Sequence, residues 1–145
     1  MNRQWWIAGA VLIVAIVAFA LSQTVFKGTS EDCRPVRALL DFNKSQGALI
    51  ASKATDQSDA PIGSYQLWAD GLAERAGKVN APNLAPDALR LAQLAGQFVA
   101  KLPSVQGVTP PPTGKGPAPP AAYELAALND QIAGEIQTLS KACPK

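Results

Sequence analysis

The residues of this chain best suited to covalent chemistry are two cysteines. Cys33 follows an apolar N-terminus, and Cys143 lies near the other end of the sequence. An even pair of cysteines in an oxidising compartment is more often bonded than free. In the chain-entropy model, closing a loop of about 110 residues stabilises a protein by on the order of 4 to 5 kcal/mol. We therefore expect a Cys33–Cys143 disulfide; the alternatives are two buried reduced thiols or bonds between chains.

Catalytic and metal-binding groups are otherwise scarce. The chain has no histidine, which removes the commonest general base and the commonest metal ligand together. It also lacks C-x-x-C, H-E-x-x-H, G-x-S-x-G, S-x-x-K and the P-loop pattern, so neither a redox pair nor a familiar nucleophile or phosphate site is indicated. The sequence predicts a protein that is not an enzyme and has no catalytic residue, metal site or cofactor.

Carboxylates are the remaining candidates for acid–base or cation chemistry. Asp70 and Glu74 lie one helical turn apart, but Glu74 is better explained as the partner of Lys78 at i+4. Asp56 and Asp59 occupy a polar turn with too few oxygen ligands in sequence for a Ca²⁺ loop. We expect Asp59 to cap the helix that follows.

The N-terminus contains a stretch long enough to cross a membrane. Residues 5–26 carry no charge and would span roughly 33 Å as a helix, against a hydrocarbon core of about 30 Å. We predict a signal-anchor helix there, with residues 1–4 in the cytoplasm and the protein in the plasma membrane. The alternative is a secreted domain, cleaved near Ala20. The expected membrane-interface anchors are Arg3, Trp5, Trp6 and Lys27.

Both alternatives place residues 28–145 outside the cytoplasm. The formal charge of +2 comes from Arg3 and Lys27, because the rest of the chain has as many basic as acidic side chains. A neutral domain without a basic stripe argues against nucleic acid as a partner. The expected partners are the membrane and another protein, and the oligomeric state is left open.

The extracytoplasmic domain is expected to be all-α. Alanine is abundant, and no stretch alternates apolar with polar residues as a half-buried strand would. Four helices are predicted, at residues 33–54, 61–77, 86–103 and 121–142.

The first predicted helix has the least regular apolar face. Pro35 is expected in its first turn, where the missing N–H does no harm. Val36 and Leu40 lie near one face, which Asn43 and Gly47 interrupt.

The other three predicted helices have apolar stripes at three- and four-residue spacing. In chain order, the stripes are Tyr65, Trp68, Leu72 and Ala76, then Leu84, Ala88, Leu91, Ala95, Phe98 and Leu102, and finally Leu125, Leu128, Ile132, Ile136, Leu139 and Cys143. Gly77 is the expected stop of the second helix.

Residues 103–120 form a predicted linker, because this proline-rich segment can neither continue a helix nor join a sheet. The linker is long enough for the last helix to run in either direction, so the cysteines decide the topology. If the helices alternate up and down, Cys33 and Cys143 meet at one end of the bundle. We expect a small up-down bundle of about four helices, closed by this disulfide and held beside the membrane.

Tyr65, Trp68 and Leu72 are open to two interpretations. Aromatic residues at helical spacing usually belong to the core, but an alanine-rich bundle can leave a ligand groove beside a bulky ring. The predicted function is a membrane-tethered, non-catalytic accessory or scaffolding subunit of a larger membrane or envelope complex, docking through the helical domain. The alternative is an extracytoplasmic module that binds a lipid or small apolar ligand near Trp68.

Overall fold

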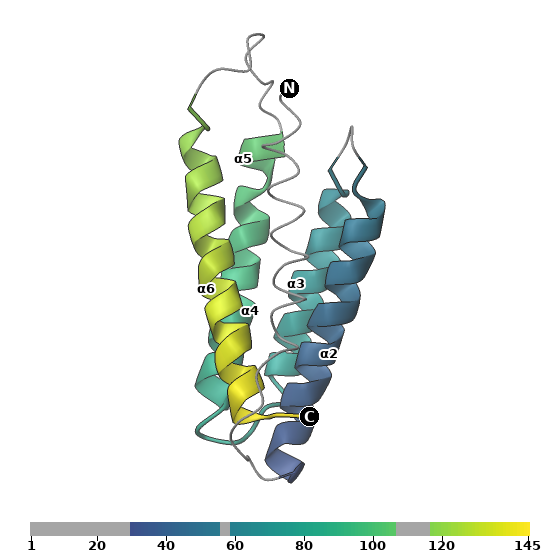
Figure 1. Ribbon diagram of the computed structural model, residues 1–145, viewed down its shortest axis with the longest axis vertical. Coiled ribbons are helices and arrows are strands. Elements are labelled where there is room, and N and C mark those ends of the chain that lie inside the picture. The colour runs from purple at the N-terminus through teal and green to yellow at the C-terminus, as the bar shows by residue number, and fades with distance from the viewer. Residues whose placement is uncertain (1–29, 56–58, 107–116) are drawn as a thin grey trace.

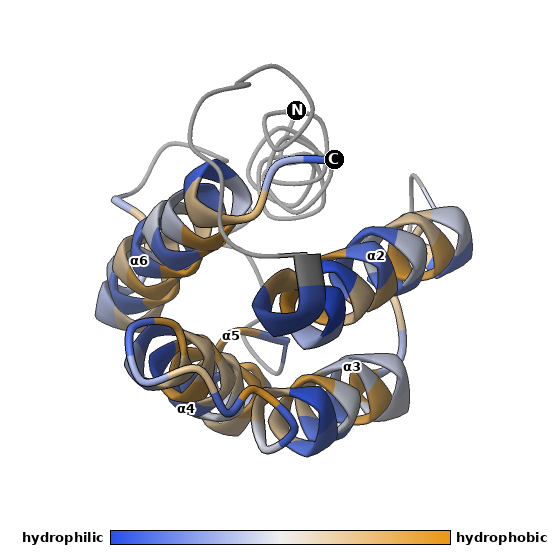
Figure 2. Ribbon diagram, turned by 90° about the horizontal axis from the view of Figure 1, so that it is seen from below, coloured by the Kyte–Doolittle hydropathy of each residue, from blue (hydrophilic) through white to orange (hydrophobic). Residues whose placement is uncertain are grey.

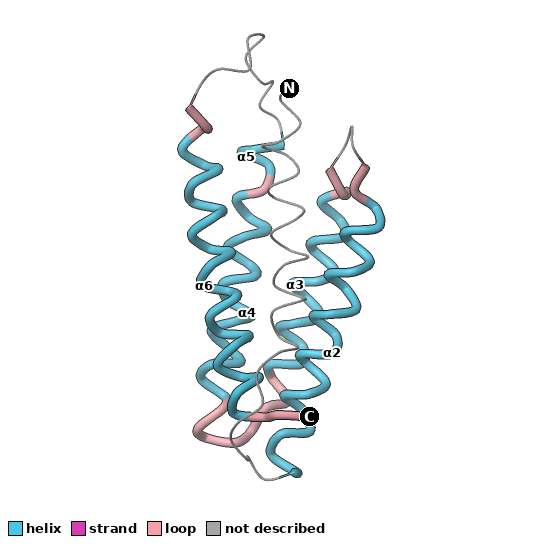
Figure 3. The backbone as a smooth tube through the Cα atoms, viewed as in Figure 1, coloured by secondary structure: helices cyan, strands magenta, loops and turns pink. Residues whose placement is uncertain are grey.

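The described part of the chain is built from helices. The computed structural model describes residues 30–55, 59–106 and 117–145, and within these ranges it contains helices and loops without any strand (Figure 3). The helices are α2 (Ser30–Lys53), α3 (Ile62–Ala76), α4 (Ala85–Lys101), α5 (Pro103–Gln106) and α6 (Pro120–Ala142). The all-α prediction with four main helices is confirmed for these residues.

The predicted membrane anchor at residues 5–26 lies outside the described residues, together with Arg3, Lys27 and the alternative cleavage site near Ala20. Of the helices that the structure describes, none combines the length and apolar composition needed to cross a bilayer. The anchor therefore stays a prediction.

The four long helices run up, down, up and down (Figure 1). Viewed along their axes, they are arranged in a ring in the order α2, α3, α4 and α6 (Figure 2). Neighbours in this order share extensive interfaces, whereas α2 and α6, which would complete the ring, contact each other much less. The bundle is tightly joined at three interfaces and weakly joined at the fourth.

Apolar stripes of α3, α4 and α6 form most of the core. All sixteen residues predicted in these stripes are buried, which confirms the three- and four-residue spacing as the signal of the buried face. At the edge of the α4/α6 interface, Arg90 pairs with Glu135 at 3.0 Å and Lys101 pairs with Glu124. These stripes meet because each helix has one apolar side to remove from water.

Helix α2 begins at Ser30, three residues before the predicted start. Glu31 and Asp32 lie in its first turn, where carboxylates interact favourably with the positive end of the helix dipole. Because of this earlier start, Pro35 lies in the second turn, and the prediction that places it in the first turn is wrong.

Asn43 and Gly47 were expected to interrupt the buried face of α2, but both are buried. The Asn43 side chain is 6% exposed, and its Oδ1 accepts a hydrogen bond from Trp68 Nε1 at 2.8 Å. This bond satisfies two polar groups that would otherwise be costly inside the bundle. The expected interruption at Asn43 is wrong because the expectation did not include Trp68 on α3, which is the hydrogen-bond partner of Asn43.

The start of α3 also differs from the prediction. Its N-cap is Pro61, no side chain caps the helix, and the backbone N–H of Ser64 donates to the Pro61 carbonyl at 2.9 Å. Asp59 is two residues upstream of the N-cap, too far along the chain to take that position. The capping role expected for Asp59 is wrong, whereas Gly77 is the C-cap as predicted.

The predicted linker at residues 103–120 begins later than expected. Pro103–Gln106 form the short helix α5, and the N–H groups of Val105 and Gln106 donate to the Leu102 carbonyl at 3.0 and 3.1 Å. Proline is tolerated at the first position of a helix because its missing N–H would have no partner there. For the same reason Pro120 can open α6. Residues 107–116 lie outside the described part of the chain.

Candidate functional site

The beginning of α2 and the end of α6 are joined by the predicted disulfide. The sulfurs of Cys33 and Cys143 are 2.04 Å apart, and the Cα atoms are 5.3 Å apart. Both cysteines are buried, at 0% and 2% exposed. The bond and the shared end of the bundle are therefore confirmed (Figure 1).

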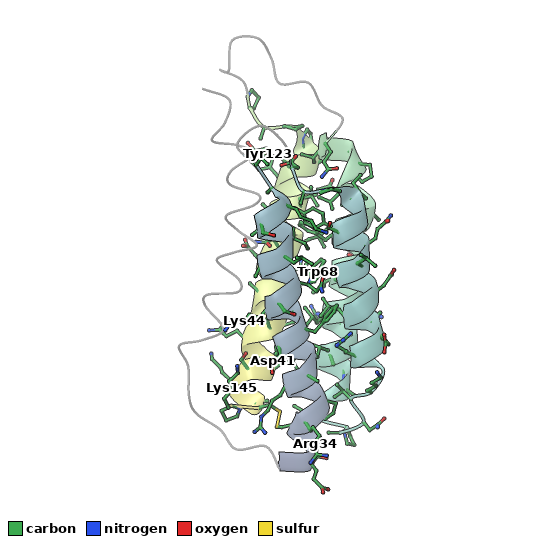
Figure 4. The ribbon with its side chains drawn as sticks, turned by 90° about the vertical axis from the view of Figure 1, so that its right-hand side faces the viewer. Arg34, Asp41, Lys44, Trp68, Tyr123 and Lys145 are labelled. Carbon is green, nitrogen blue, oxygen red and sulfur yellow. A yellow bond between two sulfur atoms is a disulfide. The ribbon has the colours of Figure 1, made fainter. Side chains whose placement is uncertain are left out.

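Residues after α6 are held on α2 by further contacts next to the disulfide. Nε and Nη2 of Arg37 donate to the Pro144 carbonyl at 3.1 and 2.8 Å. Lys145 pairs with Asp41 at 3.2 Å (Figure 4), although both side chains are mostly exposed and such a pair contributes little. We call this set of contacts, together with the disulfide, the C-terminal clamp.

The sequence predicted the disulfide of the clamp but not its polar contacts. Arg37 lies four residues after Cys33 and Asp41 four residues after Arg37, so the three residues share one side of α2. That spacing was available in the sequence. The sequence could not indicate that the Pro144 carbonyl is the acceptor, because every residue has a backbone carbonyl and the residue type does not reveal which one Arg37 contacts.

The second candidate, the aromatic cluster, consists of Tyr65 and Trp68 on α3 and Phe98 on α4. The ring centroid of Phe98 is 6.1 Å from those of Tyr65 and Trp68. Tyr65, Trp68 and Leu72 are 5%, 7% and 0% exposed, and Figure 4 shows Trp68 between the helices. These values place all three residues in the hydrophobic core of the bundle.

Beside this cluster, α2 and α3 approach each other closely at Gly71. The guanidinium of Arg75 lies 3.8 Å from the centroid of the Phe42 ring, and its Nη1 donates to the Gly71 carbonyl at 3.1 Å. A Cβ on Gly71 would overlap the ring of Phe42. Glycine at this position therefore leaves room for the outer end of the Phe42 ring, with the Arg75 guanidinium over the face of that ring.

Replacing Gly71 by alanine is expected to lower the free energy of unfolding by about 1 to 3 kcal/mol. The added methyl group displaces Phe42 from under Arg75, and overpacking of this kind outweighs the gain of about 1 kcal/mol in helix propensity. Urea denaturation followed by circular dichroism measures the change.

The control is Gly96→Ala on α4, where nothing lies within 4 Å of the added Cβ. This variant gains helix propensity without overlap and is expected to raise the free energy of unfolding by up to about 1 kcal/mol. Equal stabilisation by both substitutions would show that Phe42 does not constrain Gly71.

The hydroxyl of Tyr65 is a source of pH dependence in the core of the bundle. Burial, with a smaller contribution from the negative charge of Asp59, raises the pKa of its hydroxyl to about 12, from an ordinary value of 10.0. The pKa of Asp59 is itself raised by burial. Below the ordinary pKa both folded and unfolded chains keep the proton, so Tyr65 adds no pH dependence there.

Between about pH 10 and pH 12, Tyr65 is expected to destabilise the fold progressively, because the unfolded chain loses the phenolic proton first. Urea denaturation across this range measures the loss for the wild type and for Tyr65→Phe, in which the tyrosine contribution disappears. Tyr123 is 59% exposed, so Tyr123→Phe, which removes a hydroxyl outside the core, serves as the matched control. Parallel pH profiles for all three proteins would contradict the assignment.

The remaining predicted carboxylates do not gather into a site. Asp70 and Glu74 are exposed, and Glu74 pairs with Lys78 at 2.8 Å as predicted. The hydrogen bond from Lys78 lowers the pKa of Glu74. Asp56 lies outside the described residues. Within the ranges that the structure describes, no three cysteine or carboxylate side chains are placed to hold a metal ion.

Comparison with known proteins does not assign a function to these residues. Neither a family model, nor a curated protein, nor a solved structure gave a significant match to the chain. Any functional conclusion therefore depends on the residues and contacts described above.

Proposed function

We propose that this protein is a membrane-tethered, non-catalytic accessory or scaffolding subunit of a larger membrane or envelope complex. The observation that carries the proposal is the C-terminal clamp. It bonds the end of α6 to the start of α2, and α2 is the first described element after the apolar residues 5–26. A bundle tethered through those residues would stand with its clamped end towards the bilayer and present the sides of its helices to a partner.

The outer surface of the bundle carries a few exposed apolar side chains. One large apolar side chain is exposed on each long helix, and these residues are Leu49, Leu67, Leu89 and Tyr123, at 46%, 66%, 49% and 59% exposed. Apolar side chains placed singly are ordinary on a protein surface, and in this proposal they serve as contact points for a protein partner.

Gentle solubilisation of native membranes tests the proposal. The full chain is expected to migrate as part of an assembly larger than its monomer, and chemical cross-linking should attach partner residues to its bundle. Free monomer recovered under several mild detergents would contradict the proposal. Tyr123→Ala and Leu67→Ala remove exposed contact points without touching the core, so whichever of them lies at the interface should weaken the assembly.

The orientation is tested separately with a lysine reagent that cannot cross membranes. Lys44 and Lys78 are exposed on the bundle, and Lys44 projects outward from α2 (Figure 4). Both are expected to react when the reagent is added to whole cells whose envelope admits it to the outer face of the plasma membrane. Labelling only after the membrane is broken would place the bundle in the cytoplasm.

A further inference from the structure

Two contacts fix how α2 and α3 are aligned. The outer end of the Phe42 ring on α2 lies against Gly71 of α3. Further along α2, Lys53 Nζ donates a hydrogen bond to Ser64 Oγ of α3 at 3.2 Å. Because the helices run in opposite directions (Figure 1), the residues between Phe42 and Lys53 face those between Gly71 and Ser64. This alignment shows which exposed residues of the two helices are neighbours.

Leu49 and Leu67 are level with each other across this interface. Leu49 is seven residues after Phe42, so it lies on the same side of α2. Leu67 is four residues before Gly71, so it lies on the same side of α3. The two leucines are 46% and 66% exposed. We call them the leucine pair, because they place two apolar side chains in water along one edge of the bundle.

A cation lies on one side of the leucine pair and an anion on the other. Lys53 follows Leu49 by four residues, away from the disulfide, and Asp70 follows Leu67 by three residues, towards the disulfide. Both charged side chains are exposed, and neither forms an ion pair with another residue that the structure describes. At ~1.5 Å per residue, the two charges are about 10 Å apart along the bundle axis.

We propose that the leucine pair, together with Lys53 and Asp70, is the docking site for a helix of the partner protein. The helix carries an acidic residue facing Lys53, a basic residue facing Asp70 and apolar side chains between them. A helix advances about 10 Å in two turns, so its acidic and basic residues are two turns apart. This inference rests on the proposed function, and it names the face that docks and the chemistry of the partner.

The position and the charges of this face favour a different protein over a lipid surface or a second copy of the chain. Leu49 is about 28 Å along α2 from Ser30, the end that the proposed tether turns towards the bilayer. A second copy in the same membrane would stand at the same height. It would bring Lys53 towards Lys53 and Asp70 towards Asp70, and like charges in contact oppose association.

Three synthetic helical peptides test the site on the full chain in phosphatidylcholine nanodiscs, with empty nanodiscs as the blank. Each peptide has two central leucines and two charged residues two turns apart, which are one glutamate and one lysine, two glutamates or two lysines. The wild type is expected to bind the mixed peptide about fivefold more tightly than either of the others, because each of those meets one like charge. Fluorescence anisotropy of labelled peptides measures the affinities.

Charge reversal in the protein should change the preferred peptide. Lys53→Glu leaves two negative charges at the site and is expected to prefer the peptide with two lysines. Asp70→Lys leaves two positive charges and is expected to prefer the peptide with two glutamates. Replacing both Leu49 and Leu67 by serine should weaken binding of the mixed peptide at least about tenfold. Leu89→Ser is the matched control, because Leu89 is 49% exposed on α4, and circular dichroism shows that each variant is folded.

The docking site is overturned if the wild type binds the three peptides equally or binds none of them. It is also overturned if the charge variants keep the wild-type preference, or if Leu89→Ser weakens binding as much as loss of the leucine pair. The charge variants keep the test decisive if the double serine variant does not fold.

The assembly in native membranes distinguishes this inference from the proposed function. An assembly that forms with the wild type and persists without the leucine pair overturns the docking site and leaves the accessory role standing. A wild-type chain that selects the mixed peptide but is recovered from membranes only as a monomer overturns the accessory role alone.

Discussion

Serine at both cysteine positions, Cys33→Ser with Cys143→Ser, is expected to lower the free energy of unfolding by about 4 kcal/mol. The disulfide closes a loop across a sequence separation of 110 residues, and removing it returns that freedom to the unfolded chain. A small domain has about 5 to 15 kcal/mol in total, so the variant is left close to unfolding. Urea denaturation should also show a steeper slope, because the unfolded chain without the crosslink exposes more surface.

A matched control places two serines at exposed positions of the same helices, Ala38→Ser on α2 and Ala126→Ser on α6. Only the lower helix propensity of serine acts there, so a loss of no more than about 1 kcal/mol is expected. The double alanine variant of the cysteines distinguishes the crosslink from the polarity of serine and should behave like the double serine variant. A urea denaturation midpoint equal to that of the control would show that the disulfide contributes little to the free energy of unfolding.

Trp68→Ala is expected to lower the free energy of unfolding by about 4 kcal/mol, because truncating a buried tryptophan removes its transfer energy and leaves a cavity. The ring is 7% exposed and packs edge-on against Phe98. Its Nε1 is also the donor to Asn43, which would be left buried without a partner, at a further cost of about 1 to 3 kcal/mol. Thermal and urea denaturation both report the change.

Leu67→Ala is the control for this prediction, because Leu67 is the preceding residue on α3 and is 66% exposed. Its truncation is expected to change stability by less than about 0.5 kcal/mol. Restoring an apolar pair with Asn43→Leu in the Trp68→Ala background should recover part of the loss by removing the stranded amide. Similar effects of Trp68→Ala and Leu67→Ala would contradict the placement of Trp68 in the core.

These two predictions concern different ways of holding one bundle together. The aromatic cluster joins α2, α3 and α4 through buried surface and one internal hydrogen bond, whereas the C-terminal clamp joins α2 to α6 through a covalent bond at a single end. Loss of the clamp should therefore loosen the α2/α6 side before the rest. Hydrogen exchange of the double serine variant, resolved by helix, would show this order.

The sequence by itself determined the elements whose signal is local. Apolar residues at three- and four-residue spacing identified the buried faces of α3, α4 and α6, because a helix with one apolar side must turn that side inward. The even pair of cysteines indicated the disulfide, and an up-down order was the arrangement that brought them together. The ion pair between Glu74 and Lys78 was predictable, because their spacing along one helix is enough to define the pair.

Only the tertiary structure decided the features that need a partner from elsewhere in the chain. Asn43 interrupts the apolar face of α2 in the sequence, and only the structure shows that it accepts a hydrogen bond from Trp68. The structure likewise shows that Arg37 donates to the Pro144 carbonyl. Asp59 does not cap α3 because the helix starts further along, at a boundary set by Pro61. The ring order of the helices, and with it the weak α2/α6 side, follows from how four apolar faces pack at once. Spacing along a single helix fixes which side is buried but not which neighbour covers it.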